Sequence, residues 1–204
     1  MKTIITIQHT QSVHHTNGMV GSWTDWELTE QGKTQARNIG RNLAEIIKGR
    51  RAVMYSSDLK RAAQTAELVA EALKVTPMYR QELRERNLGK CCGKSVKWLR
   101  ENRETDEKTV DDRLFSDAES RRDEWNRLKP FYDEIMSGGE ELILIVSHGD
   151  LLSVLNTMFA GLDVTSIDSF EMFGMAGGVS FLIESDEGKH IIKRMSDTSF
   201  MMLK

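Results

Sequence analysis

Two histidines that directly follow short apolar runs are the residues of this chain best suited to chemistry. His9 follows the run 3–8, and His148 follows the run 142–147. Runs rich in β-branched residues are typical of buried strands in a parallel sheet. Open α/β sheets bind their ligands beyond the carboxyl ends of the strands. We therefore expect the two imidazoles to face one another across a single pocket.

The segments between these histidines alternate between helix and strand patterns. A helix is expected over 30–47, because Thr29 is a good N-cap and apolar residues recur there at helical spacing. A strand over 52–55 follows, and then a second helix that Ser57 or Asp58 is expected to cap. Because strands and helices alternate, the chain predicts a parallel sheet with right-handed crossovers.

The second half of the chain continues this pattern after a strongly charged stretch. Helices are expected over 118–136 and directly after His148, and a final strand pair over 178–184 and 190–195. The charged stretch at about 94–117 is expected to form a helical or loop cap over the sheet's carboxyl edge, with a solvated surface helix and loop as the alternative. We predict that the 204 residues form one domain, a three-layer α/β/α sandwich with a mostly parallel central sheet and helices on both faces.

Composition limits the classes of partner. The formal net charge at pH 7 is −3, so nothing in it favours nucleic acid or an anionic membrane. No apolar run approaches the ~18 residues that span a bilayer, and 3–7 is too short for the apolar part of a signal peptide. The only cysteines, Cys91 and Cys92, are adjacent, which excludes a long-range disulfide and favours a cytoplasmic location. The apolar segments 170–175 and 200–203 can pack internally or form a homodimer interface.

Four local motifs line up along the chain. The most specific is Ser-Asp-Leu-Lys-Arg-Ala-Ala-Gln-Thr-Ala over 57–66. The others are His9 with the segment 21–29, Leu-Arg-Glu-Arg-Asn-Leu-Gly over 83–89, and Ser-His-Gly over 147–149, and an Ala-Glu-Ser segment occupies 118–120. In order and spacing these motifs resemble the phosphoglycerate mutase-like group of the histidine phosphatase superfamily, over essentially the whole chain. The resemblance implies the phosphoglycerate mutase-like fold.

The resemblance also implies a role for each motif. His9 corresponds to a nucleophile that forms a phosphohistidine, Glu85 to the proton donor, and Arg61 and His148 to phosphate ligands. A neutral imidazole attacks phosphorus without a separate base, and Arg61 in the first turn of a helix offers a fork of donors. His148, if protonated, would add charge, and Glu85 would need a raised pKa, with Glu82 as a nearby competitor. No metal or cofactor is expected, because these cations neutralise the transferring group.

The first motif departs from the family pattern. The family has Arg-His-Gly where this chain has Gln8, His9 and Thr10. Gln8 keeps two N–H donors but loses a charge, and a charged hydrogen bond is worth about 1.5–3 kcal/mol against about 1 for a neutral one. We expect Gln8 and the Thr10 hydroxyl to donate to phosphate. His14 or His15, the latter at a position where relatives often have a phosphate-binding Asn, is expected partly to replace the missing cation.

Three functions remain open at this point. The preferred one is a phosphomonoester phosphatase that acts through a phosphohistidine on a small phosphorylated metabolite. A catalytically weak or inactive phosphate-binding protein is the alternative, because of Gln8 and Thr10. A mutase is less favoured, because the chain has two prolines and lacks the long inserted segments of dedicated mutases. A zinc site built from His9, His14, His15 and His148 has no H-x-x-x-H helix or cysteine pair to support it, so no metal is expected.

Overall fold

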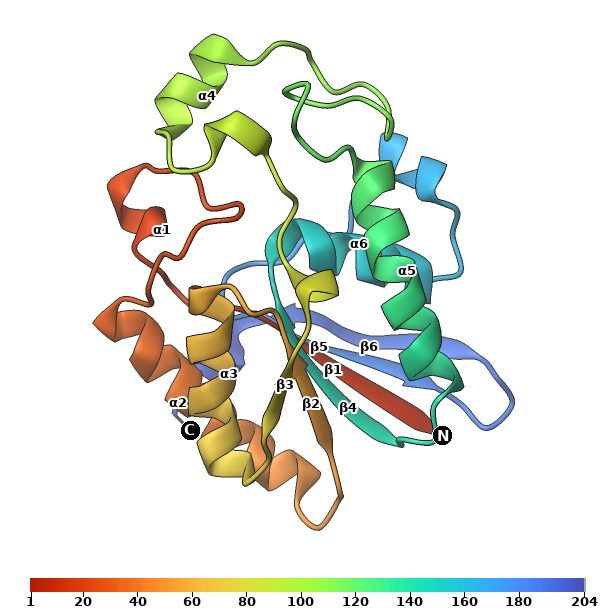
Figure 1. Cartoon of the computed structure of the whole chain (residues 1–204). Coiled ribbons are helices and arrows are strands. Elements are labelled where there is room, and N and C mark those ends of the chain that lie inside the picture. Colours follow the sequence, from red (N-terminus) through yellow and green to blue (C-terminus); the bar gives the residue numbers. More distant parts are fainter. Residues whose placement is uncertain (204) are drawn as a thin grey trace.

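A computed structural model describes residues 1–203 and has a six-stranded sheet in the order β3-β2-β4-β1-β5-β6 (Figure 1). Strand β1 (Lys2–Gln8) lies beside β4 (Leu142–Ser147), parallel and in register from Thr3 opposite Leu142 to Gln8 opposite Ser147. This register brings the residues that follow both strands to the same edge of the sheet. His9 and His148 therefore begin adjacent loops.

The remaining elements complete a mixed sheet with a helical layer on each face. Strand β5 is antiparallel to β1 and to the edge strand β6, and the other neighbouring pairs are parallel. The strands are β2 (Val53–Ser56), β3 (Pro77–Tyr79), β5 (Val179–Glu184) and β6 (His190–Asp197). The α-helices are α1 (His14–Asn17), α2 (Glu30–Ile47), α3 (Lys60–Leu73), α4 (Val96–Asn102), α5 (Arg121–Ser137) and α6 (Gly149–Phe159). Short 3₁₀ turns occupy Gln81–Leu83, Gly89–Cys91, Val164–Asp168 and Thr198–Met201.

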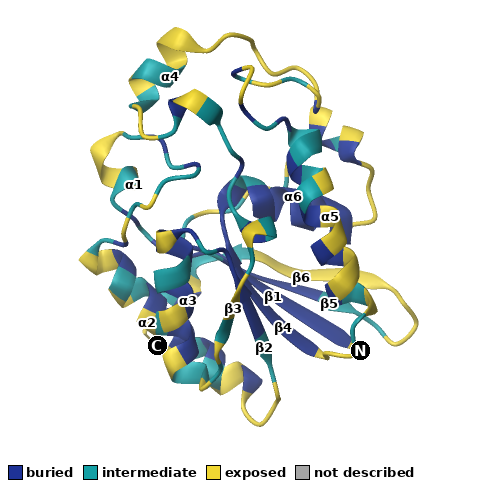
Figure 2. Ribbon diagram, in the orientation of Figure 1, coloured by how far each residue is buried: buried dark blue, intermediate teal, exposed yellow. Residues whose placement is uncertain are grey.

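Two hydrophobic cores lie on opposite faces of the sheet, because successive side chains of a strand point to opposite sides. Ile4 of β1 packs into the core under α5 and α6, whereas Ile5 and Ile7 pack into the core under α2 and α3. The central strands are buried along most of their length (Figure 2). The three-layer α/β/α sandwich predicted from the sequence is confirmed.

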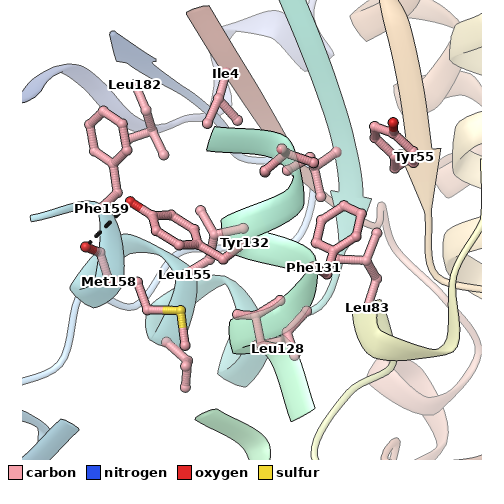
Figure 3. Packing of buried hydrophobic residues seen from close by; sticks show 14 of the residues in the cluster. Ile4, Tyr55, Leu83, Leu128, Phe131, Tyr132, Leu155, Met158, Phe159 and Leu182 are labelled. Atoms are coloured by element: carbon pink, nitrogen blue, oxygen red, sulfur yellow. Dashed lines mark hydrogen bonds between the residues drawn. The ribbon is translucent and has the colours of Figure 1, made fainter. Parts of the chain in front are cut away.

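The core under α5 and α6 is built from large side chains of both helices and of the sheet strands (Figure 3). The Phe131 ring stands edge-on to Tyr55 of β2, with 5.2 Å between ring centroids. Leu128 and Tyr132 of α5 pack in the same cluster with Leu155 of α6. Leu151, in the first turn of α6 after His148, belongs to the same cluster, so this packing fixes that turn relative to the sheet.

The start of α3 corrects one prediction. The expected caps, Ser57 and Asp58, do not occupy the N-cap position, which Leu59 takes without a side-chain cap. Ser57 instead lies in hydrogen-bond contact with His148, and Asp58 pairs with Arg84. The other long helices lie close to the predicted ranges, and the Thr29 hydroxyl caps α2 as expected. The three-residue strand β3 was not predicted, because so short a run has no visible periodicity.

The charged segment 94–117 lies beyond the carboxyl edge of the sheet and contains α4 (Figure 1). Its Phe115 is fully buried in a small separate cluster with Val20 and Cys91. Backbone hydrogen bonds join the loop after His9 to this segment, from Val20 N to Lys94 O and from Val96 N to Gly18 O. That this segment serves as a cap, and not as a solvated surface helix and loop, stays a prediction.

The apolar segments near the C-terminus divide between core and surface. Phe200 packs into the core under α2, whereas Phe170, Phe173, Met175 and Met202 are exposed. A homodimer through the exposed side chains stays a prediction. Within residues 1–203, no helix has the combination of length and apolarity that crossing a membrane requires.

Candidate active site

The two histidines predicted to meet do meet. The ring centroids of His9 and His148 are 5.2 Å apart, with the ring planes inclined at 60°. Both residues are buried, and both stand at the carboxyl ends of neighbouring parallel strands. The geometric part of the prediction is therefore confirmed. Arg61 from α3 reaches the same point and is also buried, so its guanidinium does not extend into solvent.

The protonation of His9 follows from its hydrogen bonds. Its Nδ1 lies 2.9 Å from the carbonyl oxygen of Thr10, and a carbonyl can only accept, so Nδ1 carries the proton. The lone pair is then on Nε2, which accepts from Nε of Arg61 at 3.2 Å. Burial, and then the Arg61 cation, holds the pKa of His9 well below its usual value. His9 is a neutral imidazole with Nε2 turned toward the site.

Arg61 is held by the loop that follows His9. Its two terminal nitrogens donate to the carbonyl oxygens of Ser22 and Thr24, each at 2.9 Å. With the bond to His9, three of the five guanidinium N–H groups are used. Burial lowers the pKa of Arg61 to about 10, so the side chain stays cationic at neutral pH. Two N–H groups remain for a bound anion.

His148 precedes α6 and contacts a hydroxyl of the neighbouring loop. Its Nε2 lies 2.8 Å from Ser57 Oγ, while its Nδ1 is buried and has no hydrogen-bond partner within the part of the chain that the structure describes. Burial holds its pKa well below the usual value, with Arg61 and His9 acting in the same direction. The charge considered for His148 is therefore absent from this arrangement, and its ring can contribute only an N–H donor.

The short helix α1 places His14 and His15 against His9. The His15 ring stacks on the His9 ring at 5.4 Å between centroids, and the His14 ring lies at 5.7 Å. Burial, with His15 second, lowers the pKa of His14 to about 3, and burial with Arg61 lowers the pKa of His15. Neither imidazole supplies the missing cation in this structure. The prediction that one of them partly replaces the missing cation is therefore not met, because burial keeps both rings neutral.

Gln8 and Thr10, the two residues that flank His9, were both predicted to donate to phosphate, and their side chains have different surroundings. Gln8, the last residue of β1, is half-buried. Its side-chain amide lies beside the start of α6, where a Cβ built on Gly149 would come 3.3 Å from the amide nitrogen. The side-chain oxygen Oε1 is buried and has no hydrogen-bond partner within residues 1–203. The Thr10 hydroxyl donates to the carbonyl of Gly32 at 2.8 Å and its amide to Thr65 Oγ1. The prediction that the Thr10 hydroxyl donates to phosphate is wrong, because α2 takes that proton.

Glu85 is partly buried against the first turn of α6, the helix that follows His148. Its Oε1 accepts from the amides of Arg86 at 3.0 Å and Leu151 at 3.3 Å. Desolvation, and then the negative charge of Asp150, raises the pKa of Glu85 to about 7. The indole of Trp23 donates to the Glu85 carbonyl at 2.6 Å, which fixes the main chain there. The carboxyl group has the raised pKa that a proton donor needs.

An ion-pair network behind Glu85 was missed by the sequence reasoning. Asp150 lies 3.4 Å from Nε of Arg86 and 3.3 Å from Arg121, and Arg121 also contacts the fully buried Glu124 at 3.2 Å. Burial raises the pKa of Glu124, and one of its carboxyl oxygens has no partner among the described residues. The sequence does contain one sign of this network. Asp150 lies two positions after His148, so it is an acidic residue in the first turn of the helix that follows this histidine.

Glu119, from the Ala-Glu-Ser segment, holds the loop that carries Glu85 and does not contact His9 or Arg61 in the described part of the chain. Its carboxylate accepts from the amide of Asn87 at 2.8 Å and from Arg127 at 2.8 Å. Arg127 in turn donates to the Glu85 carbonyl at 3.2 Å. The segment therefore fixes the loop that carries Glu85. Glu82, the alternative acid, does not contact His9 or Arg61 in the described hydrogen bonds, although its carbonyl accepts from Arg127.

This site and fold define the class of protein. The chain belongs to the histidine phosphatase superfamily (branch 1), whose sequence pattern matches residues 4–198. The resemblance stated from the motifs is confirmed at the level of the family.

Similar proteins include both mutases and phosphatases. A 2,3-bisphosphoglycerate-dependent phosphoglycerate mutase of Bartonella bacilliformis is 26% identical over 204 residues, which cover 95% of this chain and 97% of that protein. Phosphoserine phosphatase 1 of Hydrogenobacter thermophilus is 26% identical over 203 residues, covering 97% and 93%. A mycobacterial glucosyl-3-phosphoglycerate phosphatase solved with VO3 superposes with a TM-score of 0.82 at 19% identity, over 96% of this chain and 99% of that chain. The likeness of that structure supports the fold alone.

Proposed function

We propose that this protein hydrolyses the phosphomonoester of a small phosphorylated metabolite through a phosphohistidine on His9. The observation that carries the proposal is the tautomer of His9, in which Thr10 takes the Nδ1 proton and Nε2 keeps its lone pair. A neutral imidazole next to a buried guanidinium has the form that a nucleophile toward a phosphate dianion requires. Two named relatives, a phosphoserine phosphatase and a phosphoglycerate mutase, act on small phosphorylated compounds.

Phosphate binding requires donors around three oxygens. Arg61 has two unused N–H groups on its terminal nitrogens. The buried Nδ1 of His148 becomes a donor when the Ser57 hydroxyl donates to Nε2. Ser12 N donates to Nδ1 of His15, which leaves the proton of that neutral ring on Nε2, a further donor beside the half-buried Gln8 amide.

In the first chemical step, Nε2 of His9 forms a bond to phosphorus while the bond from phosphorus to the ester oxygen breaks. Glu85, protonated up to about pH 7, gives its proton to the leaving oxygen. The phosphate passes to His9 and the alcohol leaves. Arg61 stabilises the negative charge that spreads over the equatorial oxygens.

In the second step, the carboxylate of Glu85 takes a proton from water as the water oxygen attacks phosphorus. The bond from phosphorus to His9 breaks, its electrons return to Nε2, and inorganic phosphate is released. Glu85 is thus acid and then base, and its pKa near neutrality suits both roles. No step uses a metal or a cofactor.

The loss of the family arginine at Gln8 is the reason to keep a second function, a weak or inactive phosphate-binding protein. Here Arg61 also donates to the nucleophilic nitrogen, so binding must redirect this bond before attack. A cytoplasmic location and a small phosphorylated substrate, with neither nucleic acid nor membrane as partner, are part of the proposal. The cap segment 94–117 would limit the size of the substrate.

Product analysis separates the three functions. Purified protein is incubated with p-nitrophenyl phosphate and, separately, with 3-phosphoglycerate, and free phosphate and transferred phosphate are both measured. We expect free phosphate from the wild-type protein and none from His9→Ala. Transfer between hydroxyls without net phosphate release would support a mutase. Phosphate binding by calorimetry with no turnover would support the binding protein.

A further inference from the structure

We propose that His9, His14 and His15 form a binding site for one divalent transition metal ion, and that a metal there blocks the proposed nucleophile. The second half of this statement rests on the proposed function, whereas the binding itself does not. One ring nitrogen from each of the three residues lies within 4.8 Å of the other two. No acidic group or thiol takes part in this cluster, so the donor set is purely imidazole, which suits Zn²⁺, Ni²⁺ or Cu²⁺.

The geometry is close to a three-histidine site with one open position. Zinc–nitrogen bonds are about 2.0–2.1 Å, so three tetrahedral ligand nitrogens lie about 3.4 Å apart. Separations of up to 4.8 Å must therefore shorten by up to about 1.4 Å on metal binding. His15 is exposed, and His14 and His15 both belong to the four-residue helix α1 at the surface. Side-chain rotations on this short helix can bring the two rings toward the buried His9.

Hydrogen bonds already orient two of the three rings as metal ligands. A metal-binding imidazole usually gives its other N–H to a carbonyl or a polar group. Nδ1 of His9 donates to Thr10 O, and Nδ1 of His14 lies 2.7 Å from Ser12 Oγ, so Nε2 of each is left for the metal. His15 is the ligand that must change, because its Nδ1 accepts from Ser12 N at 3.2 Å. Its exposed ring turns to present a lone pair.

The charge next to the cluster favours a cation more than the family pattern does. Gln8 stands where the family has arginine, so one positive charge is missing beside His9. Arg61 remains, but the carbonyls of Ser22 and Thr24 hold its terminal nitrogens. A metal replaces only the contact from Arg61 Nε to His9 Nε2. The same lone pair cannot bind a metal and attack phosphorus, so a bound metal prevents the first chemical step.

Metal binding is tested directly by titrating chelator-treated full-length protein with Zn²⁺ by calorimetry and with Co²⁺ by visible absorption. We expect one ion per chain and the absorption of Co²⁺ with nitrogen ligands. His14→Gln and His15→Gln are each expected to weaken binding at least about tenfold, as loss of one of three ligands should. His190→Gln is the matched control, because His190 stacks on Phe159 far along the chain and should not change the affinity.

Several results would overturn the site. They are absence of binding to the wild-type protein, equal loss of affinity in His190→Gln, and unchanged affinity in both the His14 and His15 variants. A sulfur-to-cobalt charge-transfer band would assign the ion to the partly exposed Cys92 instead. Circular dichroism of each variant confirms that it is folded, and two ligand variants are used so that one unfolded protein does not decide the result.

Inhibition is a separate arm. With p-nitrophenyl phosphate as substrate, Zn²⁺ is expected to lower the rate, and a chelator is expected to restore it. An unchanged rate at a Zn²⁺ concentration that saturates the site by calorimetry would contradict the claim that the metal blocks the nucleophile. If the protein has no phosphatase activity at all, the proposed function fails while calorimetry still reports on the metal site, so the two failures are distinguishable.

Discussion

The imidazole cluster (His9, His14, His15 and His148) and the carboxyl cluster (Glu85, Glu124 and Asp150) lie at the same edge of the sheet and respond to burial in opposite directions. Desolvation lowers the pKa of His9 and His148, and the Arg61 cation lowers both further. Desolvation raises the pKa of Glu85, and Asp150 raises it further. Each cluster therefore has a nearby charge of its own sign, which strengthens the effect of burial. The result is a neutral imidazole at His9 and a carboxyl group at Glu85 that keeps its proton up to about pH 7.

The two clusters also differ in what holds them. Main-chain carbonyls and hydroxyls hold the imidazoles, as at Thr10 and Ser57. Ion pairs hold the carboxyl cluster, and Arg86 extends this network to Glu107 of the cap segment at 2.6 Å. The cap segment is also joined to the loop after His9, from Val20 N to Lys94 O, so it contacts the surroundings of both clusters. The following variants test this difference from the largest expected effect to the smallest.

Removal of the nucleophile should have the largest effect. His9→Ala is expected to lower the rate of p-nitrophenyl phosphate hydrolysis by at least about 10³-fold, because the covalent route is lost. His190→Ala, which changes a histidine outside the site, should retain the wild-type rate. Activity that survives in His9→Ala would show that the imidazole cluster does not contain the nucleophile.

Removal of the acid should have the next largest effect, and it depends on pH. The wild-type kcat/KM for an alkyl phosphate is expected to fall as the pH rises above about 7, because Glu85 loses its proton there. Glu85→Gln should be slower by about 10²–10⁴-fold below that pH and should lack this alkaline limb. A pH–rate profile of both proteins is the measurement. The same limb in Glu85→Gln would assign it to another group.

Asp150→Asn changes the carboxyl cluster without touching the proposed reacting atoms. Loss of its negative charge, with Arg86 and Arg121 left in place, should lower the pKa of Glu85 and move the alkaline limb to lower pH. At pH 8 the rate relative to that at pH 6 should fall by up to about tenfold. Glu171→Gln removes an exposed partner of Arg121 and is the control. Equal shifts in both variants would mean that Asp150 has no special effect on Glu85.

Restoring the family residue should have the smallest effect of the four. Gln8→Arg is expected to tighten phosphate binding by up to about tenfold, because a charged donor replaces a neutral one. Gln8→Met keeps the length but removes the donor and should weaken binding. Calorimetry with inorganic phosphate measures both. Loss of binding in Gln8→Arg would indicate that Gln8 serves another ligand.

The sequence predicted the parts of the site that follow from strand ends and local motifs. His9 and His148 could be placed together because parallel neighbours share an edge, and Arg61 because its motif begins a helix. The register of β1 on β4 was not needed for that inference. The fold followed from the same alternation of strands and helices.

The rest of the site depends on contacts between distant segments, which no local pattern encodes. The Thr10 hydroxyl was assigned to phosphate, but the close approach of α2 gives its proton to Gly32. The charge of His15 was misjudged because burial beside Arg61 is a tertiary property. The pairing of Arg121 with Asp150 joins the start of α5 to the start of α6, and neither segment suggests it alone.

A phosphoenzyme trap tests the central claim most directly. Glu85→Gln should accumulate the intermediate from ³²P-labelled p-nitrophenyl phosphate, because p-nitrophenolate leaves without an acid whereas hydrolysis of phospho-His9 needs the base. After rapid quenching in alkali, we predict a label that is lost in acid and lies on the peptide that contains His9. No label, an acid-stable label, or a label on another residue would contradict the proposal that His9 carries the phosphate.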